Sequence, residues 1–392
     1  MSPKNQRKIL LMLAIAVIAL NLRPAIAGVG PLIPEIRLDT GLSNTFLGML
    51  ITLPVMSFGL FSVLTPLLTR RIGTGPTMAV ALILLTLGIL LRVVPSAVAL
   101  FGGTIVIGIG IALGNVLLPG IVKQRFPSRV GIVTGIYSAM LGMGAAIASG
   151  ISVPLSEGQG FGWRWALGIW AMVSLAGLII WLPQMKGQET EVSRKSLRSA
   201  MRYLSSSPMA WYVASFMGLQ SLTFYIIITW LPDILIERGI TAVQAGGMLA
   251  VVQAVGAVGT FAFPSWASGR QRQRLPVVII VVLELVSLAG LLITTLSFLQ
   301  TVILAAMLGF SLGSSFGMAL LFIGLRAGDT DTVNQLSGMS QSAGYTLAAA
   351  GPALFGALHD LVNNWMLPIG VLLVLACVKM WSGWKAGMDD VV

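Results

Sequence analysis

Apolar stretches long enough to cross a membrane recur along the whole chain, separated by short segments that contain charged residues, proline or glycine. A transmembrane α-helix needs about 20 predominantly apolar residues. The predicted spans are 8–36, 43–69, 75–94, 98–122, 130–154, 163–184, 209–232, 242–266, 276–297, 299–325, 333–357 and 365–386. The pattern therefore predicts an all-α polytopic membrane protein with twelve transmembrane helices.

The amino-acid composition supports this prediction. Of the 392 residues, 56% are hydrophobic and 9% are charged, whereas a soluble domain is about 25% charged. The single cysteine, Cys377, excludes an intramolecular disulfide and a two-cysteine metal site. The sequence contains no Gly-x-x-x-x-Gly-Lys-Ser/Thr loop and no cluster with metal-ligand spacing. We therefore expect neither an ATPase nor a metalloenzyme, and no cofactor.

The first apolar stretch has an alternative interpretation as a signal peptide. Basic residues precede it, and Ala25-Ile26-Ala27 resembles a cleavage site. However, the apolar pattern continues past that point to Ile33, which favours a first span that is retained.

The distribution of positive charge predicts the orientation. Lys and Arg residues stay preferentially in cytoplasmic loops, and most of the 24 fall on one side if the N-terminus is cytoplasmic. This set includes Lys4, Arg7, Lys8, Arg70, Arg71, Lys123, Arg125, Arg129, Lys186, Arg270, Arg272, Arg274, Arg326, Lys379 and Lys385, while Arg37, Arg92, Arg164 and Arg238 fall at outer ends. We predict that both termini are cytoplasmic. The net charge of +11 is then a topology signal and not a nucleic-acid site.

The longest polar stretch divides the chain into two similar halves. Pro34-Glu35 recurs as Pro232-Asp233, and the glycines Gly110 and Gly114 recur as Gly309 and Gly313. The sequence therefore predicts an N-terminal six-helix bundle at 1–185, a cytoplasmic interdomain linker at 186–208 and a C-terminal six-helix bundle at 209–392. Two such halves in parallel topology are the arrangement of the major facilitator superfamily, with the substrate site between them near the midplane.

Three motifs give the sequence a more specific resemblance. The first span reads Leu20-Asn21-Leu22-Arg23-Pro24 and then Val29-Gly30-Pro31-Leu32-Ile33-Pro34, the fourth ends in Leu118-Pro119-Gly120, and the seventh ends in Trp230-Leu231-Pro232. These motifs resemble the cyanate porter family, which includes bacterial 2-nitroimidazole exporters. The resemblance implies a monomeric transporter of a small solute.

The chain departs from the wider superfamily in the loop after the second span. Arg71-Ile72-Gly73 fits the usual Asp-Arg-x-Gly element, but Arg70 stands where the Asp would be. The resemblance therefore does not extend to the gating ion pair of that Asp.

Arg23 is the first candidate for a substrate contact. It lies about 22 Å of helix beyond Lys8, and an intramembrane charge is by default functional. We predict that it binds an anionic ligand, the alternative being a structural Arg held by carbonyls, Glu35 or Asp39. Asn21 can share its face only if the helix is broken, as Pro24 permits. For Asn21, substrate contact and a helix–helix hydrogen bond are both open.

Polar residues near the midpoints of the other cavity-lining or flanking spans are further candidates. Each is often a helix–helix contact instead, and aromatic residues are more often plain packing. The candidates for substrate binding are Asn115, Tyr137, Gln220, Tyr225, Gln253, Ser314, Phe316 and Gln341.

Glu284 is the carboxylate nearest to the middle of a span, which makes it a proton-coupling candidate. In this superfamily the ninth span is peripheral, so we favour a neutral Glu284 held by structural hydrogen bonds. His359 is expected at the outer end of the eleventh span, as a surface residue more than as a proton relay.

The sequence thus predicts a secondary active transporter that moves a small anionic or polar solute, cyanate being the first expectation, by alternating access. Proton-coupled efflux of a neutral heterocycle such as a nitroimidazole is the alternative. A receptor or membrane enzyme is a third class, disfavoured because no extramembrane domain or catalytic cluster is apparent. The expected partners are the solute, the lipid bilayer and, as coupling ion, protons.

Overall fold

The computed structural model describes residues 3–62, 64–126, 130–158, 162–185, 204, 206–293, 295–327 and 330–388, and these residues form helices and short connections without a strand. Contacts group the chain into two units. The first is Met1–Gly41 with Met49–Ser193, and the second is Leu42–Gly48 with Arg194–Val392. The linker predicted at 186–208 lies mostly outside the described residues.

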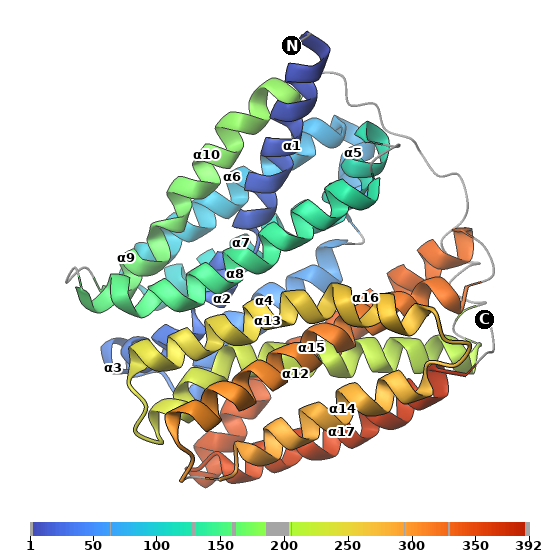
Figure 1. Ribbon diagram of the computed structural model, residues 1–392. Helices are drawn as coiled ribbons and strands as arrows, with labels where there is room; N and C mark the ends of the chain where they lie inside the picture. The colour runs from blue at the N-terminus through green and yellow to red at the C-terminus, as the bar shows by residue number, and fades with distance from the viewer. Residues whose placement is uncertain are drawn as a thin grey trace. The chain divides into compact units, whose positions relative to one another are not determined.

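The first unit corresponds to the first six predicted spans, several of which are interrupted (Figure 1). Its elements are α1 (Pro3–Asn21), α2 (Pro24–Ala27), η1 (Gly30–Leu32), α3 (Ile33–Thr40), α4 (Asn44–Ser62), α5 (Thr65–Ile72), α6 (Thr74–Val93), α7 (Ala97–Arg125), α8 (Val130–Gly158), α9 (Gly162–Gly168), α10 (Trp170–Trp181) and η3 (Leu182–Gln184). The start of α4, up to Gly48, groups with the second unit.

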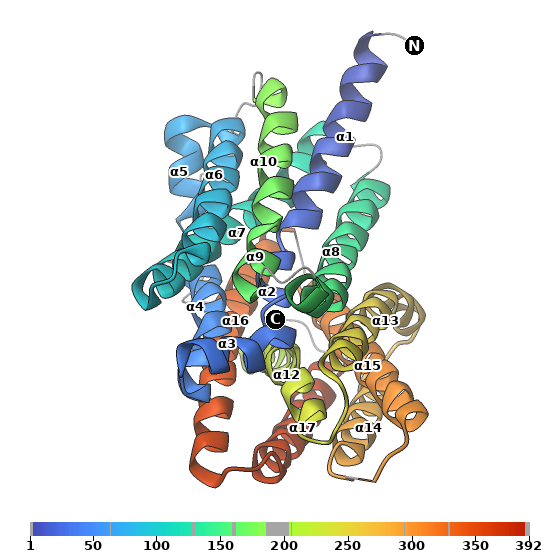
Figure 2. The same cartoon turned by 90° about the vertical axis from the view of Figure 1, so that its left-hand side faces the viewer.

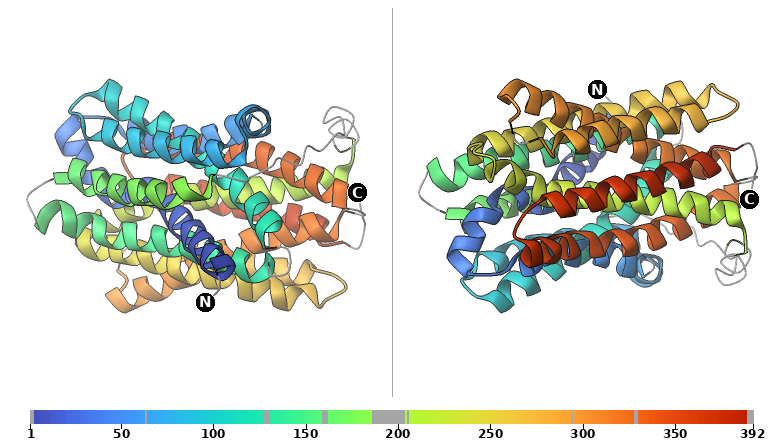
Figure 3. Two further views of the ribbon diagram at one scale, coloured as in Figure 1. Left: turned by 90° about the horizontal axis from the view of Figure 1, so that it is seen from above. Right: turned by 90° about the horizontal axis from the view of Figure 1, so that it is seen from below.

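Apart from the start of α4, the second unit consists of uninterrupted helices. They are α12 (Pro208–Ile236), α13 (Ala242–Ser268), α14 (Arg274–Gly290), α15 (Phe298–Leu325), α16 (Thr330–Val362) and α17 (Met366–Ala386). Figure 3 shows α17, in red, running alongside the yellow-green α12.

The predicted spans agree closely with these helices. Within the described residues, ten helical segments are long and apolar enough to cross a membrane. The other two predicted spans correspond to α14, which has 17 residues, and to α16, whose first half is rich in polar residues. The ninth span was predicted to extend to residue 297 but ends at Gly290, where Leu291 and Leu292 form a turn. Each of the twelve predicted spans thus corresponds to helical segments among the described residues, as expected for an all-α polytopic membrane protein.

Helix pairing repeats between the two units. In the first unit α1 packs against α8 and α10, and α6 packs against α7 and α10 (Figure 2). In the second, α12 packs against α16 and α17, and α14 packs against α15 and α17. Each unit therefore joins its first helix to its fifth and sixth, and its third helix to its fourth and sixth.

Three of the repeated glycines, Gly110, Gly309 and Gly313, lie against the backbone of a neighbouring helix, whereas Gly114 lies against the side chain of Leu22. A Cβ atom on Gly110 would lie 2.7 Å from the carbonyl oxygen of Ala81 on α6. A Cβ atom on Gly309 would overlap the backbone of Val252 on α13. Small residues permit this packing in membrane helices, although the two glycines face different neighbours in the two units.

Candidate functional site

The first span is broken in the middle of its apolar stretch. α1 ends at Asn21, Leu22 and Arg23 form a turn, and α2 begins at Pro24. Proline has no N–H, so Pro24 cannot donate to the carbonyl of Leu20 as the helix pattern requires. The break that the sequence allowed at Pro24 is therefore confirmed. In transporters, broken helices expose backbone and side-chain groups to bound substrates.

Arg23 is the N-cap residue of this second segment. Its carbonyl oxygen accepts hydrogen bonds from the N–H groups of Ile26 at 3.1 Å and Ala27 at 2.9 Å, which anchors its backbone to α2. Its side chain is partly exposed. Among the described residues, no hydrogen bond or ion pair engages its guanidinium group, so the charge is available to a ligand.

The two carboxylates that could have held Arg23 are engaged elsewhere. Glu35 accepts hydrogen bonds from the hydroxyl of Ser156 and, at 3.0 Å, from the backbone N–H of Trp163. Asp39 forms an ion pair with Arg164 at 2.6 Å and accepts from the indole N–H of Trp163 at 3.2 Å. Neither carboxylate therefore holds Arg23, and its contact with a substrate stays a prediction.

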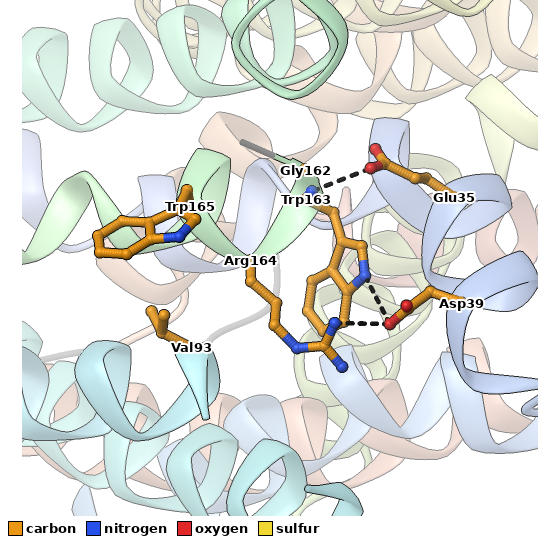
Figure 4. Close-up of a pocket in the computed structure, with 7 residues that line it drawn as sticks. All are labelled: Glu35, Asp39, Val93, Gly162, Trp163, Arg164 and Trp165. Carbon is orange, nitrogen blue, oxygen red and sulfur yellow. Dashed lines mark hydrogen bonds and ion pairs between the residues drawn. The ribbon is translucent and has the colours of Figure 1, made fainter. Parts of the chain in front are cut away.

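These groups surround a pocket of about 240 Å³ at the end of α3. Figure 4 shows Glu35 and Asp39 on one side of Trp163, and Arg164 reaching to Asp39 across the Trp163 ring, 4.3 Å from its centroid. The hydrogen-bonded contacts join α3 to α8 and α9. We interpret the pocket as a clamp that fixes the far end of the first span.

Asn21, the last residue of α1 before the break, links α1 to α10. Its side-chain amide donates to the carbonyl of Val173 on α10 at 2.8 Å and to that of Val17 at 3.3 Å, and its exposed fraction is 1%. The structure thus provides the helix–helix hydrogen bond that was one of its two expected roles. A substrate contact by Asn21 stays a prediction.

The remaining polar candidates are distributed over both units. Asn115 and Tyr137 are partly exposed on α7 and α8. In the second unit Gln220, Tyr225, Gln253 and Ser314 are buried, while Phe316 and Gln341 are partly exposed. Their participation in one substrate site stays a prediction.

Some of these side chains already have protein partners. The amide of Gln220 donates to Ser221 at 2.6 Å, and that of Gln341 donates to Ser337 at 2.7 Å. The hydroxyl of Ser314 lies 3.4 Å from the carbonyl of Gly259, and Tyr225 packs edge-on against Phe224. Any ligand that Gln220 or Gln341 binds would share the amide with these contacts.

Glu284 has a partner that the sequence did not reveal. It is fully buried on α14 and forms an ion pair with Lys379 on α17, which is also fully buried. The hydroxyl of Ser311 lies 3.3 Å from the same carboxylate. The prediction that Lys379 belongs with the cytoplasmic loop cations is therefore wrong, because counting charges near span ends does not detect pairing between helices.

Two residues that lie at helix ends, as predicted, make contacts that the sequence did not reveal. Arg92, counted at an outer helix end, has an exposed fraction of 2%. His359 lies 3.1 Å from the Glu237 carboxylate, 3.0 Å from the Asn44 amide and against the ring of Trp365. Arg92 lies in the last turn of α6, and its burial comes from packing against α2, so the sequence held no local signal for it.

Comparisons with known proteins agree with the fold. A model of the Major Facilitator Superfamily matches residues 9–352. The 2-nitroimidazole transporter of Escherichia coli K12 is 39% identical over 99% of this chain and 98% of its own length. The cyanate transport protein CynX of the same organism is 28% identical over 91% and 92%.

A solved structure extends the likeness to three dimensions. The crystal structure of a D-xylose-proton symporter superposes with a TM-score of 0.75 at 14% identity, over 98% of this chain and 99% of that one. At this identity the likeness concerns the fold alone. Together with the family match, it shows that the chain is a multi-pass membrane transporter that belongs to the Major Facilitator Superfamily, in the group of the cyanate and 2-nitroimidazole transporters.

Proposed function

We propose that this transporter moves a small anionic solute, such as cyanate, by alternating access, and that Arg23 binds the anion. The observation that carries the proposal is the guanidinium group of Arg23, which has no partner among the described residues at a break inside a membrane span. A charge at that depth is costly unless something compensates it. An anionic substrate supplies that compensation.

Release of the substrate sets a limit on how strongly the site binds. A transporter gains from a site whose contacts change when its two six-helix halves, 1–185 and 209–392, switch orientation. One charge with a few uncharged hydrogen-bond donors meets this need better than a heavily charged pocket. Asn115, Gln253 and Gln341 are the donors that we assign to this role.

A second candidate function is proton-coupled efflux of a neutral heterocycle. It is supported by the 39% identity with the 2-nitroimidazole transporter. In that case an acid such as Glu284 would carry the proton. Its ion pair with Lys379 argues against this role, because protonation of Glu284 would leave the Lys379 ammonium buried without a counter-charge.

The topology, oligomeric state and cellular location that we propose follow from the charge distribution and from the family. We place both termini on the cytoplasmic side, because most Lys and Arg residues lie in the loops on that side. We propose that the transporter works as a monomer in the plasma membrane.

A thermal-shift titration of purified protein tests the assignment of Arg23. A ligand that binds the folded state raises the apparent melting temperature with its concentration. Sodium cyanate and 2-nitroimidazole are compared on the unaltered protein, on Arg23→Ala and on Arg23→Lys, with sodium chloride at equal ionic strength as the control. We expect cyanate to stabilise the unaltered protein, to stabilise Arg23→Lys less and to leave Arg23→Ala unchanged. Equal stabilisation of Arg23→Ala, or stabilisation by 2-nitroimidazole alone, would overturn the proposal.

A further inference from the structure

The break in the first span leaves several backbone carbonyls without their helical donors, among them those of Ala25 and Ala27. In a continuous helix the N–H of Val29 would bond to the carbonyl of Ala25, but here it bonds to Ile26 at 3.2 Å. The carbonyl of Ala27 would require an N–H at position 31, which Pro31 lacks. Both residues are buried, and a buried carbonyl without a donor is costly inside a membrane.

Side chains from two other helices supply the missing donors. The guanidinium Nη1 of Arg92 on α6 donates to Ala25 at 2.7 Å. The hydroxyl of Ser149 on α8 shares its one proton between the carbonyl of Ala27 at 3.1 Å and that of Ala145, in its own helix, at 3.0 Å. The four-residue α2 segment is therefore held from both sides within the first unit.

The two donors differ greatly in what they cost. Ser149 is a neutral hydroxyl and carries no charge into the membrane. Arg92 carries a full charge with an exposed fraction of 2%, and its Nε and Nη2 atoms have no hydrogen-bond partner among the described residues. A neutral donor would satisfy the Ala25 carbonyl at lower cost, so the need for a donor alone does not account for an arginine.

The position of the Arg92–Ala25 hydrogen bond suggests why a buried arginine is present despite the free energy it costs. α2 is capped by Arg23, whose carbonyl accepts from Ile26 and Ala27, so the Arg23 backbone and the Ala25 carbonyl belong to one hydrogen-bonded turn. Fixing Ala25 fixes this turn. The free positive charge of Arg92 also favours an anion over a neutral solute near the break.

We propose that Arg92 is a positioning residue for substrate binding: by holding the Ala25 carbonyl it fixes the α2 turn and thereby the orientation of Arg23. The inference rests on the proposed anion-binding role of Arg23. Functional sites often lower the stability of natural proteins. An unpaired buried charge next to the broken span fits this pattern.

The test separates a positioning role from a structural one. Variants Arg92→Met and Arg92→Lys are compared with the unaltered protein for three quantities: melting temperature without ligand, cyanate affinity, and hydrogen exchange of the Ala27 and Gly28 amides. These amides donate to Arg23 and Pro24 within the α2 turn. For Arg92→Met we expect little change in melting temperature, because loss of the hydrogen bond to Ala25 is offset by removal of an uncompensated buried charge. We also expect cyanate affinity at least about tenfold weaker (about 1.4 kcal/mol) and faster exchange of the two amides. Arg92→Lys should recover part of both losses, because it keeps the charge and a donor.

Arg326 provides a matched control in the second unit. It is also buried, but its guanidinium donates to the carbonyl of Ala386 at 2.8 Å and to the side chain of Gln273. Arg326→Met should lower the melting temperature and leave both cyanate affinity and α2 exchange unchanged.

Each outcome decides between the two claims. If Arg92→Met leaves amide exchange in α2 unchanged, the positioning role is overturned, whatever happens to cyanate. If exchange rises but the unaltered protein binds no cyanate, the positioning role stands and the proposed anion substrate falls. A lower melting temperature with unchanged cyanate affinity would make Arg92 a structural residue.

Discussion

The third and sixth helices pack against each other in both units, but different chemistry joins them. Between α6 and α10 of the first unit, the hydroxyl of Thr86 donates to that of Ser174 at 2.9 Å. Between α14 and α17 of the second, Glu284 and Lys379 form a fully buried ion pair. The same helix pairing thus forms with neutral groups or with charges, so the fold itself does not require a buried charge there.

The units also differ in how the charges inside their helical spans are balanced. In the second unit, the charge of Lys379 is compensated by Glu284. In the first unit, Arg23 and Arg92 lie at the break with no acidic partner among the described residues. We infer that the second unit uses buried charge to join helices, whereas the first keeps positive charge available for an anion.

Breaking the ion pair on one side gives the largest expected effect. Lys379→Ala leaves Glu284 buried without a counter-charge, which should cost about 3–5 kcal/mol of unfolding free energy. The double variant Lys379→Met with Glu284→Leu should retain most of the stability, because it removes both charges. Reversible unfolding of detergent-solubilised protein measures the difference. If the double variant is as unstable as Lys379→Ala, the lost stability comes from losing the ion pair itself and not from leaving Glu284 without a counter-charge.

The next effect concerns binding and not stability. Arg23→Ala should weaken cyanate binding at least about tenfold, or about 1.4 kcal/mol. The free energy of unfolding should change little, because the side chain has no partner among the described residues. Titration calorimetry and denaturant unfolding on the same preparation separate these quantities. A large loss of stability with unchanged affinity would place Arg23 among the structural charges.

Asn21→Ala should have a smaller effect. It removes the hydrogen bond to Val173 on α10, which contributes about 0.5–1.5 kcal/mol. Unfolding measurements should detect that loss, while cyanate affinity should change only as far as α1 moves. If affinity falls as much as in Arg23→Ala, Asn21 contacts the substrate directly.

Removing the neutral hydrogen bond between α6 and α10 of the first unit should have the smallest effect on stability. Thr86→Val preserves the side-chain shape and removes the hydroxyl that bonds to Ser174. Hydrogen bonds between membrane helices average about 0.6 kcal/mol in double-mutant cycles. A loss of unfolding free energy above about 2 kcal/mol is more than such cycles have given. It would contradict the contrast between the neutral α6–α10 contact and the charged α14–α17 contact.

The sequence predicted the features that depend on neighbouring residues. Hydropathy identified the spans, and Pro24 indicated the break, because both signals are local. The burial of Lys379 and Arg92 was not predicted, because it depends on helices distant in sequence. The role of Arg92 depends on the orphaned carbonyl of Ala25, which becomes visible only when the hydrogen bonds of the broken span are traced.

Transport in proteoliposomes tests the central claim most directly, namely that free positive charge at the break in the first span binds a translocated anion. Radiolabelled cyanate counterflow would be measured for the unaltered protein, Arg23→Ala and Arg23→Lys, with labelled 2-nitroimidazole in parallel. We predict cyanate counterflow by the unaltered protein, reduced counterflow by Arg23→Lys and none above background by Arg23→Ala. Undiminished cyanate counterflow by Arg23→Ala, or counterflow of 2-nitroimidazole alone, would contradict the account.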